Sequence, residues 1–180
     1  MKRLTLLRHA KSGWETEVAR DFDRPLNAKG RRAARAVGRH MRDQGMMFDH
    51  VIASPATRVV ETLAQVGDGY GRALDPALDR RVYLASASTL LDVLHEAPDE
   101  AESLLLGGHN PGMEELVLML VPDDAGVGRS QVEEKFPTAS LAEIRFDAGR
   151  WEDVRPGNGT LIRFVRPRDI DPTLGPETAA

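Results

Sequence analysis

Leu4-Thr5-Leu6-Leu7-Arg8-His9 is a short apolar run that ends in a cation and an imidazole. Short apolar runs of this kind are typical of buried strands. Two later runs end similarly, because residues 51–53 lead into Ser54-Pro55-Ala56-Thr57-Arg58 and residues 104–106 lead into Gly108-His109-Asn110-Pro111-Gly112. Open α/β sheets bind their ligands beyond the carboxyl ends of the strands. The three segments therefore predict one functional site at one edge of a sheet.

Length and composition predict a single domain without a nucleic-acid partner. The chain has 180 residues, of which 41% are hydrophobic, and its formal net charge is −4. A chain of this length can bury one core. Binding to a phosphate backbone requires concentrated positive charge, which this composition lacks. We expect one domain over residues 1–166, followed by a surface or flexible C-terminal tail over residues 167–180.

The cysteine count and the N-terminal sequence bear on chemistry and location. The sequence contains no cysteine, which excludes disulfides, thiolate metal ligands and a cysteine nucleophile. The apolar run after Met1-Lys2-Arg3 is too short for a signal-peptide core, and no segment has the length of a membrane span. We therefore expect a cytoplasmic protein without a membrane partner.

Periodicity and capping residues predict strands that alternate with helices. Asn27 is a candidate N-cap for a helix over residues 28–44, and Ser86 or Ser88 for a helix that ends near His95. Gly67-Asp68-Gly69 is expected to end a helix that begins at Pro55. The other predicted elements are strands over residues 48–53, 102–107 and 160–165, a helix over residues 111–121, and a hairpin of residues 140–146 with 151–154. This alternation predicts one layered α/β domain.

Two polar segments interrupt the alternation. Residues 11–24 are expected to form a long loop over the sheet edge, and so long a loop in a compact domain usually has a function. Residues 123–137 are charged, contain glycine and have few apolar anchors, so we expect a mobile excursion there.

Four side chains near the strand ends are candidates for one anion-binding pocket. They are Arg8, His9, Arg58 and His109. Loops that follow parallel strands gather at one sheet edge, so these side chains are expected to converge. Guanidiniums offer forked donors to phosphate oxygens, and a neutral imidazole such as His9 can attack phosphorus to form a phosphoramidate. The histidines and carboxylates show no metal-ligand spacing, so no metal is expected.

The ordered set of motifs resembles the histidine phosphatase superfamily, and within it the short SixA-type phosphohistidine phosphatases. The matching segments are Leu7-Arg8-His9-Ala10-Lys11-Ser12, Asp23-Arg24-Pro25-Leu26 with Gly30, Ser54-Pro55-Ala56-Thr57-Arg58 with Glu61-Thr62, Tyr83-Leu84-Ala85-Ser86, and Gly108-His109-Asn110-Pro111. The resemblance covers nearly the whole chain, as far as Val165. It implies a three-layer α/β fold with a mostly parallel, doubly wound sheet of the phosphoglycerate mutase-like type, and an enzyme without metal or cofactor.

The resemblance also implies roles for individual residues. His9 would be the phosphorylated nucleophile. The phosphate pocket would consist of Arg8, Arg58 and His109. Arg24 would lie at the pocket rim and contact substrate, or else form an ion pair at the start of the next helix. The asparagine that commonly follows in this loop of the superfamily has no clear match here, and Ser12 either replaces it as a donor to the substrate or is a solvated loop residue.

The sequence departs from the superfamily pattern in two places. Ala10 stands where many members have glycine after Arg-His. Larger members use a carboxylate as general acid, and the corresponding residues 83–86 contain none, which leaves Asp79 and Tyr83 as unassigned candidates. Proton donation typically contributes about 10²–10⁴-fold, so alkyl phosphates should react slowly. A phosphoramidate suffers less, because its leaving nitrogen is readily protonated from water.

These inferences favour a phosphatase that forms a covalent phosphohistidine intermediate and acts on phosphohistidine in a protein partner. Three alternatives remain open. One is a phosphatase of small phosphorylated molecules with the same residues, and another is a phosphoglycerate-mutase-type transferase. The third is a non-catalytic phosphate-binding module that regulates a partner.

Overall fold

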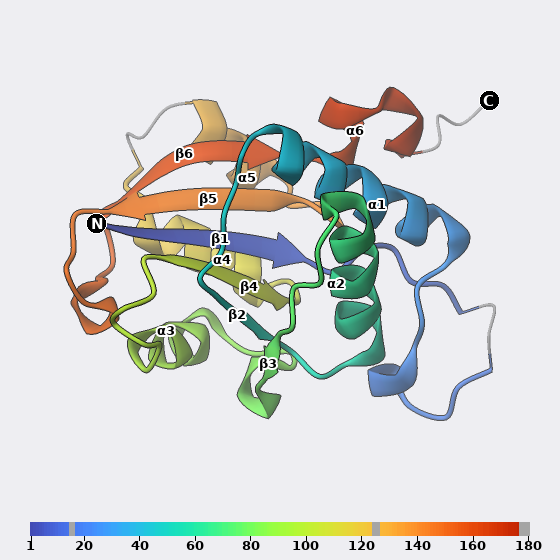
Figure 1. The fold of residues 1–180 in the computed structure, drawn as a ribbon, viewed down its shortest axis with the longest axis horizontal. Coiled ribbons are helices and arrows are strands. Elements are labelled where there is room, and N and C mark those ends of the chain that lie inside the picture. The colour runs from blue at the N-terminus through green and yellow to red at the C-terminus, as the bar shows by residue number, and fades with distance from the viewer. Residues whose placement is uncertain (15–16, 124–126, 177–180) are drawn as a thin grey trace.

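Three layers make up the fold, with a six-stranded sheet between two layers of helices (Figure 1). The computed structural model describes residues 1–14, 17–123 and 127–176. The strands are β1 (Lys2–Arg8), β2 (His50–Ala53), β3 (Ala77–Leu78), β4 (Ser103–Gly108), β5 (Leu141–Phe146) and β6 (Gly159–Val165). The α-helices are α1 (Ala28–Asp43), α2 (Thr57–Tyr70), α3 (Ala87–His95), α4 (Gly112–Leu120), α5 (Val127–Glu134) and α6 (Pro167–Ile170). No helix in this described part of the chain is long and apolar enough to span a membrane.

The sheet has the strand order β3-β2-β4-β1-β5-β6. β3, β2, β4 and β1 are mutually parallel, whereas β5 runs antiparallel to both of its neighbours. The predicted α/β fold with a mostly parallel sheet is confirmed. In the register of the sheet, Arg8 lies opposite Gly108 and Ala53 lies opposite Gly107. The carboxyl ends of β1, β2 and β4 therefore meet at one edge, where their arrowheads lie in Figure 1.

The helices bury both faces of the sheet. Leu4 and Leu6 of β1 belong to a core cluster with α3 and α4, while Leu7 belongs to a second cluster with α1 and α2. In Figure 1, α1 and α2 lie in front of the sheet and α4 lies behind it. Because neither face meets solvent, a central strand such as β1 can be apolar along its length rather than alternating.

The first two helices show why one predicted boundary is correct and another is wrong. α1 begins after Asn27, whose Oδ1 accepts a hydrogen bond from Gly30 N at 2.8 Å, as the capping pattern predicts. α2 does not end at Gly67 but continues to Tyr70. A Cβ on Gly69 would lie 2.1 Å from the carbonyl oxygen of Arg35, and one on Gly38 would lie 2.1 Å from that of Val66. These glycines thus serve the close packing of α1 against α2 rather than helix termination.

The segment after α4 corrects two further expectations. Instead of a mobile excursion, most of residues 123–137 form α5 and the turn after it, with Val132 and Phe136 fully buried, although residues 124–126 lie outside the described residues. The partner of β5 in its hairpin is β6 rather than residues 151–154. Trp151 instead begins a short 3-10 helix, η3 (Trp151–Asp153), and its indole Nε1 donates to Ala101 O at 2.8 Å. The buried indole and its hydrogen bond hold this segment against the residues that precede β4.

Residues 167–174 form two short helical turns on the surface of the α1 and α2 layer. They are α6 and the 3-10 helix η4 (Pro172–Leu174). Ile170 and Leu174 pack against the core cluster of that layer. The division of the chain at residue 166 stays a prediction, and residues 177–180 lie outside the described residues.

We predict that Gly69→Ala destabilises the protein. Glycine to alanine within a helix ordinarily stabilises by about 1 kcal/mol. Here the added Cβ would meet a backbone oxygen, so α1 and α2 must separate, and small-to-large changes in a packed core cost about 1–3 kcal/mol. The free energy of unfolding in urea should fall relative to wild type. Gly149→Ala, whose Cβ would meet nothing within 4 Å, is the matched control. A gain in stability for Gly69→Ala would contradict the packing argument.

Candidate active site

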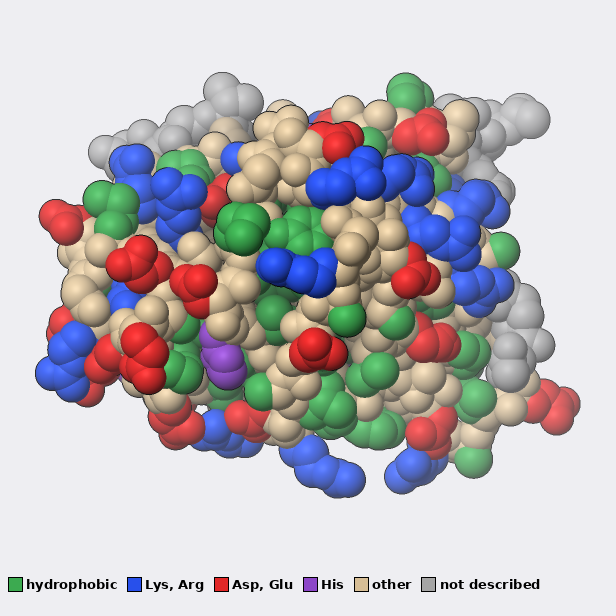
Figure 2. All heavy atoms as spheres, viewed as in Figure 1, with side chains coloured by type: hydrophobic (Ala, Val, Ile, Leu, Met, Phe, Trp, Pro, Cys, Tyr) green, Lys and Arg blue, Asp and Glu red, His purple; other side chains and the backbone are tan. Residues whose placement is uncertain are grey.

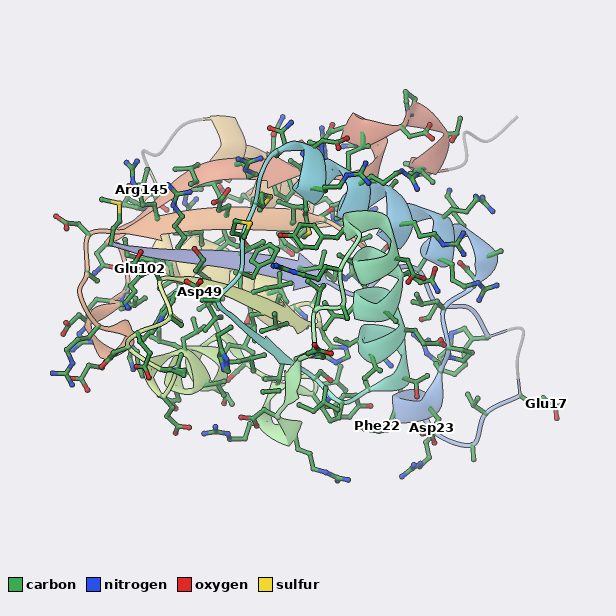
Figure 3. The ribbon with its side chains drawn as sticks, in the orientation of Figure 1. Glu17, Phe22, Asp23, Asp49, Glu102 and Arg145 are labelled. Carbon is green, nitrogen blue, oxygen red and sulfur yellow. The ribbon has the colours of Figure 1, made fainter. Side chains whose placement is uncertain are left out.

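The candidate site lies beyond the ends of β1, β2 and β4. His9 follows β1, and its backbone N donates to Gly108 O at 3.1 Å. His109 follows β4, and its ring centroid lies 5.4 Å from that of His9. The loop between β1 and α1 closes the same end of the molecule, where Figure 3 shows Phe22 and Asp23. The predicted convergence of the strand ends thus brings the two imidazoles together.

His9 has one ring nitrogen fixed by the backbone and one left for chemistry. Its Nδ1 lies 2.7 Å from Ala10 O, and because a carbonyl only accepts, Nδ1 carries the proton. Nε2 then holds a lone pair. Burial, and less strongly the charges of Arg8 and Arg58, lower the pKa of His9 to about 4, although the hydrogen bond to the Ala10 carbonyl opposes the shift. At neutral pH the imidazole is therefore uncharged and nucleophilic.

His109 is oriented by Ser54, the first residue after β2. Its Nε2 lies 2.8 Å from Ser54 Oγ, and the same hydroxyl oxygen accepts from Ala56 N at 3.2 Å. The hydroxyl keeps a proton that can be donated to Nε2, and in that tautomer of His109 the ring proton lies on Nδ1. That Nδ1 is buried and has no hydrogen-bond partner among the described residues. Burial, followed by the charges of Arg58 and His9, lowers the pKa of His109 to about 3.

Two arginines complete the set that the sequence predicted. Arg8 Nη1 donates to Phe136 O at 2.9 Å, so the buried turn after α5 holds this guanidinium. Arg58 is 3% exposed, and its Nη1 and Nη2 donate to Asp21 O at 2.8 Å and Asp21 Oδ2 at 3.0 Å. The Nε atoms of both arginines are buried without a hydrogen-bond partner in the described part of the chain. The pocket thus contains buried hydrogen-bond donors that no described residue accepts.

Asp21 is a pocket residue that the sequence analysis missed. Its Oδ2 also accepts from the Tyr83 hydroxyl at 2.7 Å, and its Oδ1 lies 3.4 Å from Arg24 Nε. Desolvation raises the pKa of Asp21, but hydrogen bonds from Tyr83 and Arg58 outweigh it and lower the pKa overall. The short 3-10 helix η1 (Asp21–Asp23) turns this carboxylate toward Arg58. The available signal was its i,i+3 spacing to Arg24, which is common to many acidic and basic pairs.

Arg24 and Ser12 lie at the rim and contact each other. Arg24 Nη2 donates to Ser12 Oγ at 2.7 Å, and the Arg24 guanidinium lies 4.1 Å from the centroid of the Trp14 ring. Arg24 also forms the ion pair with Asp21, so the ion-pair alternative for this residue describes its contacts in the free protein. Its charge contributes to lowering the pKa of His9, which places it within electrostatic reach of the imidazole.

Of the two candidate general acids, the structure brings only Tyr83 to the histidines. The centroid of its ring lies 5.3 Å from that of His109. Burial and the Asp21 carboxylate raise the pKa of the Tyr83 hydroxyl. Asp79 instead pairs with Arg81 at 2.8 Å, and Arg81 pairs with Glu96 at 2.7 Å in an exposed network. Within the described residues, no three His, Asp or Glu side chains form a group that could hold a metal ion.

Comparison with known proteins gives the family. The sequence profile of the histidine phosphatase superfamily (branch 1) matches residues 4–82. An uncharacterized protein of Mycobacterium tuberculosis is 37% identical over 166 residues, which cover 90% of this chain and 100% of that protein. The chain belongs to the histidine phosphatase superfamily. Within the matched range lie Arg8, His9 and Arg58, whereas His109 comes after it in the sequence.

Solved structures place the chain within one branch of this superfamily. A protein of Agrobacterium tumefaciens described as a candidate phosphohistidine phosphatase SixA is 28% identical, with a TM-score of 0.77 over 92% of this chain and 97% of that one. A second, from Nakamurella multipartitia, is 26% identical, with a TM-score of 0.79 over 92% and 96% of the two chains. The resemblance to SixA-type histidine phosphatases that the sequence motifs indicate is confirmed, as is the phosphoglycerate mutase-like sheet.

We predict that the two buried histidines make the protein less stable in mild acid. Folded His9 and His109 have pKa values of about 4 and about 3, whereas an unfolded histidine titrates near 6.5. Below about pH 6.5 the unfolded chain therefore binds protons that the folded chain does not. Their contribution to stability is present above this pH and is lost as the pH falls, by up to about 1.4 kcal/mol per pH unit for each histidine.

The measurement is the free energy of unfolding in urea at several pH values from about 7 down to about 5, a range above the titration of ordinary carboxylates. Wild type should lose stability over this range. The double variant His9→Gln/His109→Gln should show a flatter dependence, whatever its absolute stability. Equal slopes for the two proteins would contradict the assignment of neutral, buried imidazoles.

Proposed function

We propose that this protein is a phosphohistidine phosphatase in which His9 is the nucleophile. The observation that carries the proposal is a neutral imidazole with a free Nε2 beside three groups that can donate hydrogen bonds to a phosphoryl anion, two of them positively charged. These groups are Arg8, Arg58 and His109. The unpartnered polar atoms at Arg8 Nε, Arg58 Nε and His109 Nδ1 support it, because a bound oxyanion would satisfy the two arginine donors and, in the tautomer protonated at Nδ1, His109 as well.

In the first step, the lone pair on His9 Nε2 attacks phosphorus. A phosphorus–nitrogen bond forms to His9 while the bond from phosphorus to the leaving atom breaks, and the leaving group keeps that electron pair and takes a proton from solvent. The proton on His9 Nδ1 stays hydrogen-bonded to Ala10 O, so the positive charge that develops on the ring is partly spread onto this dipole. Arg8, Arg58 and His109 donate to the non-bridging oxygens as charge redistributes on them.

In the second step, water attacks the phosphorus of phosphorylated His9. The new phosphorus–oxygen bond replaces the phosphorus–nitrogen bond, which returns its electron pair to Nε2 and restores the neutral ring. Inorganic phosphate leaves, and the proton lost by water passes to solvent. Splitting one displacement into two in this way is the general advantage of nucleophilic catalysis.

The composition of the pocket favours a phosphoramidate substrate over an alkyl phosphate. Asp21 is ionised at neutral pH because its pKa is lowered, and the Tyr83 hydroxyl has a raised pKa, so neither readily gives up a proton to a leaving oxygen. A leaving nitrogen is more basic and takes its proton from water. The likeness to SixA structures supports the same substrate class.

We predict that wild type forms a phosphate-mass adduct on His9 after brief exposure to phosphoramidate, a labile phosphate donor. Mass spectrometry under conditions that preserve phosphoramidates should detect the adduct on wild type and not on His9→Ala. Vanadate should suppress it by competing for the same donors. His50→Ala, which changes a histidine at the opposite end of β2, is the matched control and should retain the adduct.

The outcome also separates the open alternatives. Turnover by His9→Ala at the wild-type rate would show that another group is the nucleophile. A protein that binds phosphate but gives neither adduct nor turnover with phosphoramidate or phosphohistidine peptides would be a phosphate-binding module. Transfer of the adduct to phosphoglycerate rather than water would indicate a mutase-type reaction.

We predict a rate preference for phosphohistidine over alkyl phosphate. The value of kcat/KM for a phosphohistidine peptide should exceed that for glycerol 3-phosphate by about 100-fold or more, the usual contribution of a general acid, because neither Asp21 nor Tyr83 among the described residues readily gives up a proton. Tyr83→Phe should alter both substrates by a similar factor, because it removes a contact to Asp21 rather than a proton donor. A selective loss on glycerol 3-phosphate would identify Tyr83 as a general acid and favour small phosphomonoesters as substrates.

A further inference from the structure

A cavity of about 350 Å³ opens beside the carboxyl end of β1, between α1, the turn after α5 and the C-terminal helices. Its lining includes six cationic residues, namely Arg8, Lys11, Lys29, Lys135, Arg166 and Arg168. No carboxylate is among the described residues that line it. In a chain with a formal net charge of −4, this concentration of one sign of charge is local rather than a reflection of composition.

Some of these cationic side chains have no partner among the described residues. Lys29 Nζ donates to Gly175 O at 2.5 Å, and Arg166 pairs with Asp169 at 2.9 Å. The ammonium groups of Lys11 and Lys135 make no hydrogen bond or ion pair with any described residue. Cations that share a concave surface reinforce one another's potential, and such a surface attracts anions.

The cavity adjoins the phosphate pocket. Arg8 belongs to the lining of the cavity and is next to His9 in the chain, and Lys11 follows His9 by two residues. Ala33, Pro137 and Leu174 provide apolar wall between the charges. A volume of this size is at the small end of ligand pockets. It accommodates a carboxylate-bearing side chain together with the adjoining residues of a peptide segment.

Positive charge continues from the cavity along α1, which makes a polypeptide a better ligand than a small molecule. Lys29 and Ala33 of α1 form one wall of the cavity, and the exposed Arg32 and Arg39 lie further along the same helix. Figure 2 shows Lys and Arg side chains gathered over α1. The arginine-rich first helix thus forms a basic surface that extends outward from the cavity.

We propose that the cavity binds an acidic side chain of a phosphorylated protein substrate, in the segment that carries the phosphohistidine. The substrate is then held at two points, with its phosphoryl group at the catalytic pocket and an aspartate or glutamate in the cavity. This inference rests on the proposed function for the identity of the substrate. The affinity of the cavity for acidic peptides does not depend on catalysis, so the two can be tested apart.

The test measures peptide binding to His9→Ala protein by fluorescence anisotropy, with vanadate present to occupy the phosphate pocket. The probe is a labelled peptide with four consecutive aspartates, and the same peptide with four asparagines reports non-electrostatic binding. The aspartate peptide should bind and the asparagine peptide should not. Lys135→Gln/Arg168→Gln should weaken binding by about tenfold, as expected for the loss of two exposed ion pairs. Lys135→Gln alone should weaken binding by a smaller factor, and Arg145→Gln, at the opposite end of the sheet in Figure 3, is the charge-matched control for this single variant and should bind as tightly as the parent.

Two results would overturn the proposal. Binding of the aspartate peptide that appears only when vanadate is left out would place it in the phosphate pocket, and equal weakening by Arg145→Gln and Lys135→Gln would show general attraction to positive charge. If the double variant fails to fold, Lys135→Gln alone must still weaken binding, by a smaller factor. Specific peptide binding by a protein that never forms the His9 adduct would leave the cavity assignment intact and remove only the proposed enzymatic function.

Discussion

The parallel alignment of β1 with β4, and of β4 with β2, is the constraint on which the site depends. The backbone pairs fix Arg8 opposite Gly108 and Ala53 opposite Gly107. The residues that follow the three strands therefore lie at the same edge of the sheet. Gly108 lets α4 pack closely against the end of β4, because a Cβ on Gly108 would lie 3.1 Å from Sδ of Met113 in α4. Residues separated by about 100 positions in the sequence therefore meet without any flexible element between them and the core.

Gathering several cations in a buried pocket is electrostatically unfavourable, and the chain reduces the repulsion in two ways. Both imidazoles stay neutral, because burial and the nearby guanidiniums lower their pKa values. Asp21 supplies a negative charge to Arg58 and Arg24. A dianionic phosphoryl group, the ligand proposed above, would supply the same compensation, so the pocket suits such a group in charge as well as in donor geometry.

Local signals in the sequence predicted the parts of the structure that local forces determine. The strand ends at Arg8 and His109 and the Asn27 cap were visible because apolar runs and capping residues act within a few positions. The end of α2 was not, because Gly69 is explained by the carbonyl of Arg35 on another helix. Asp21 was missed for the same reason, since its role follows from the distance to Arg58 across the fold. Tertiary packing decided these cases against local propensity.

The ion pair between Asp21 and Arg58 offsets part of the positive charge of the pocket before any anion binds. Asp21 occupies two donors of Arg58, so an incoming anion that uses the free Nε gains less attraction than a guanidinium without a carboxylate partner would give. Monovalent anions such as chloride or acetate offer little beyond what Asp21 provides, whereas a dianion offers an additional charge and more acceptor oxygens. The ion pair thus favours dianions over anions with a single charge at the proposed phosphate pocket.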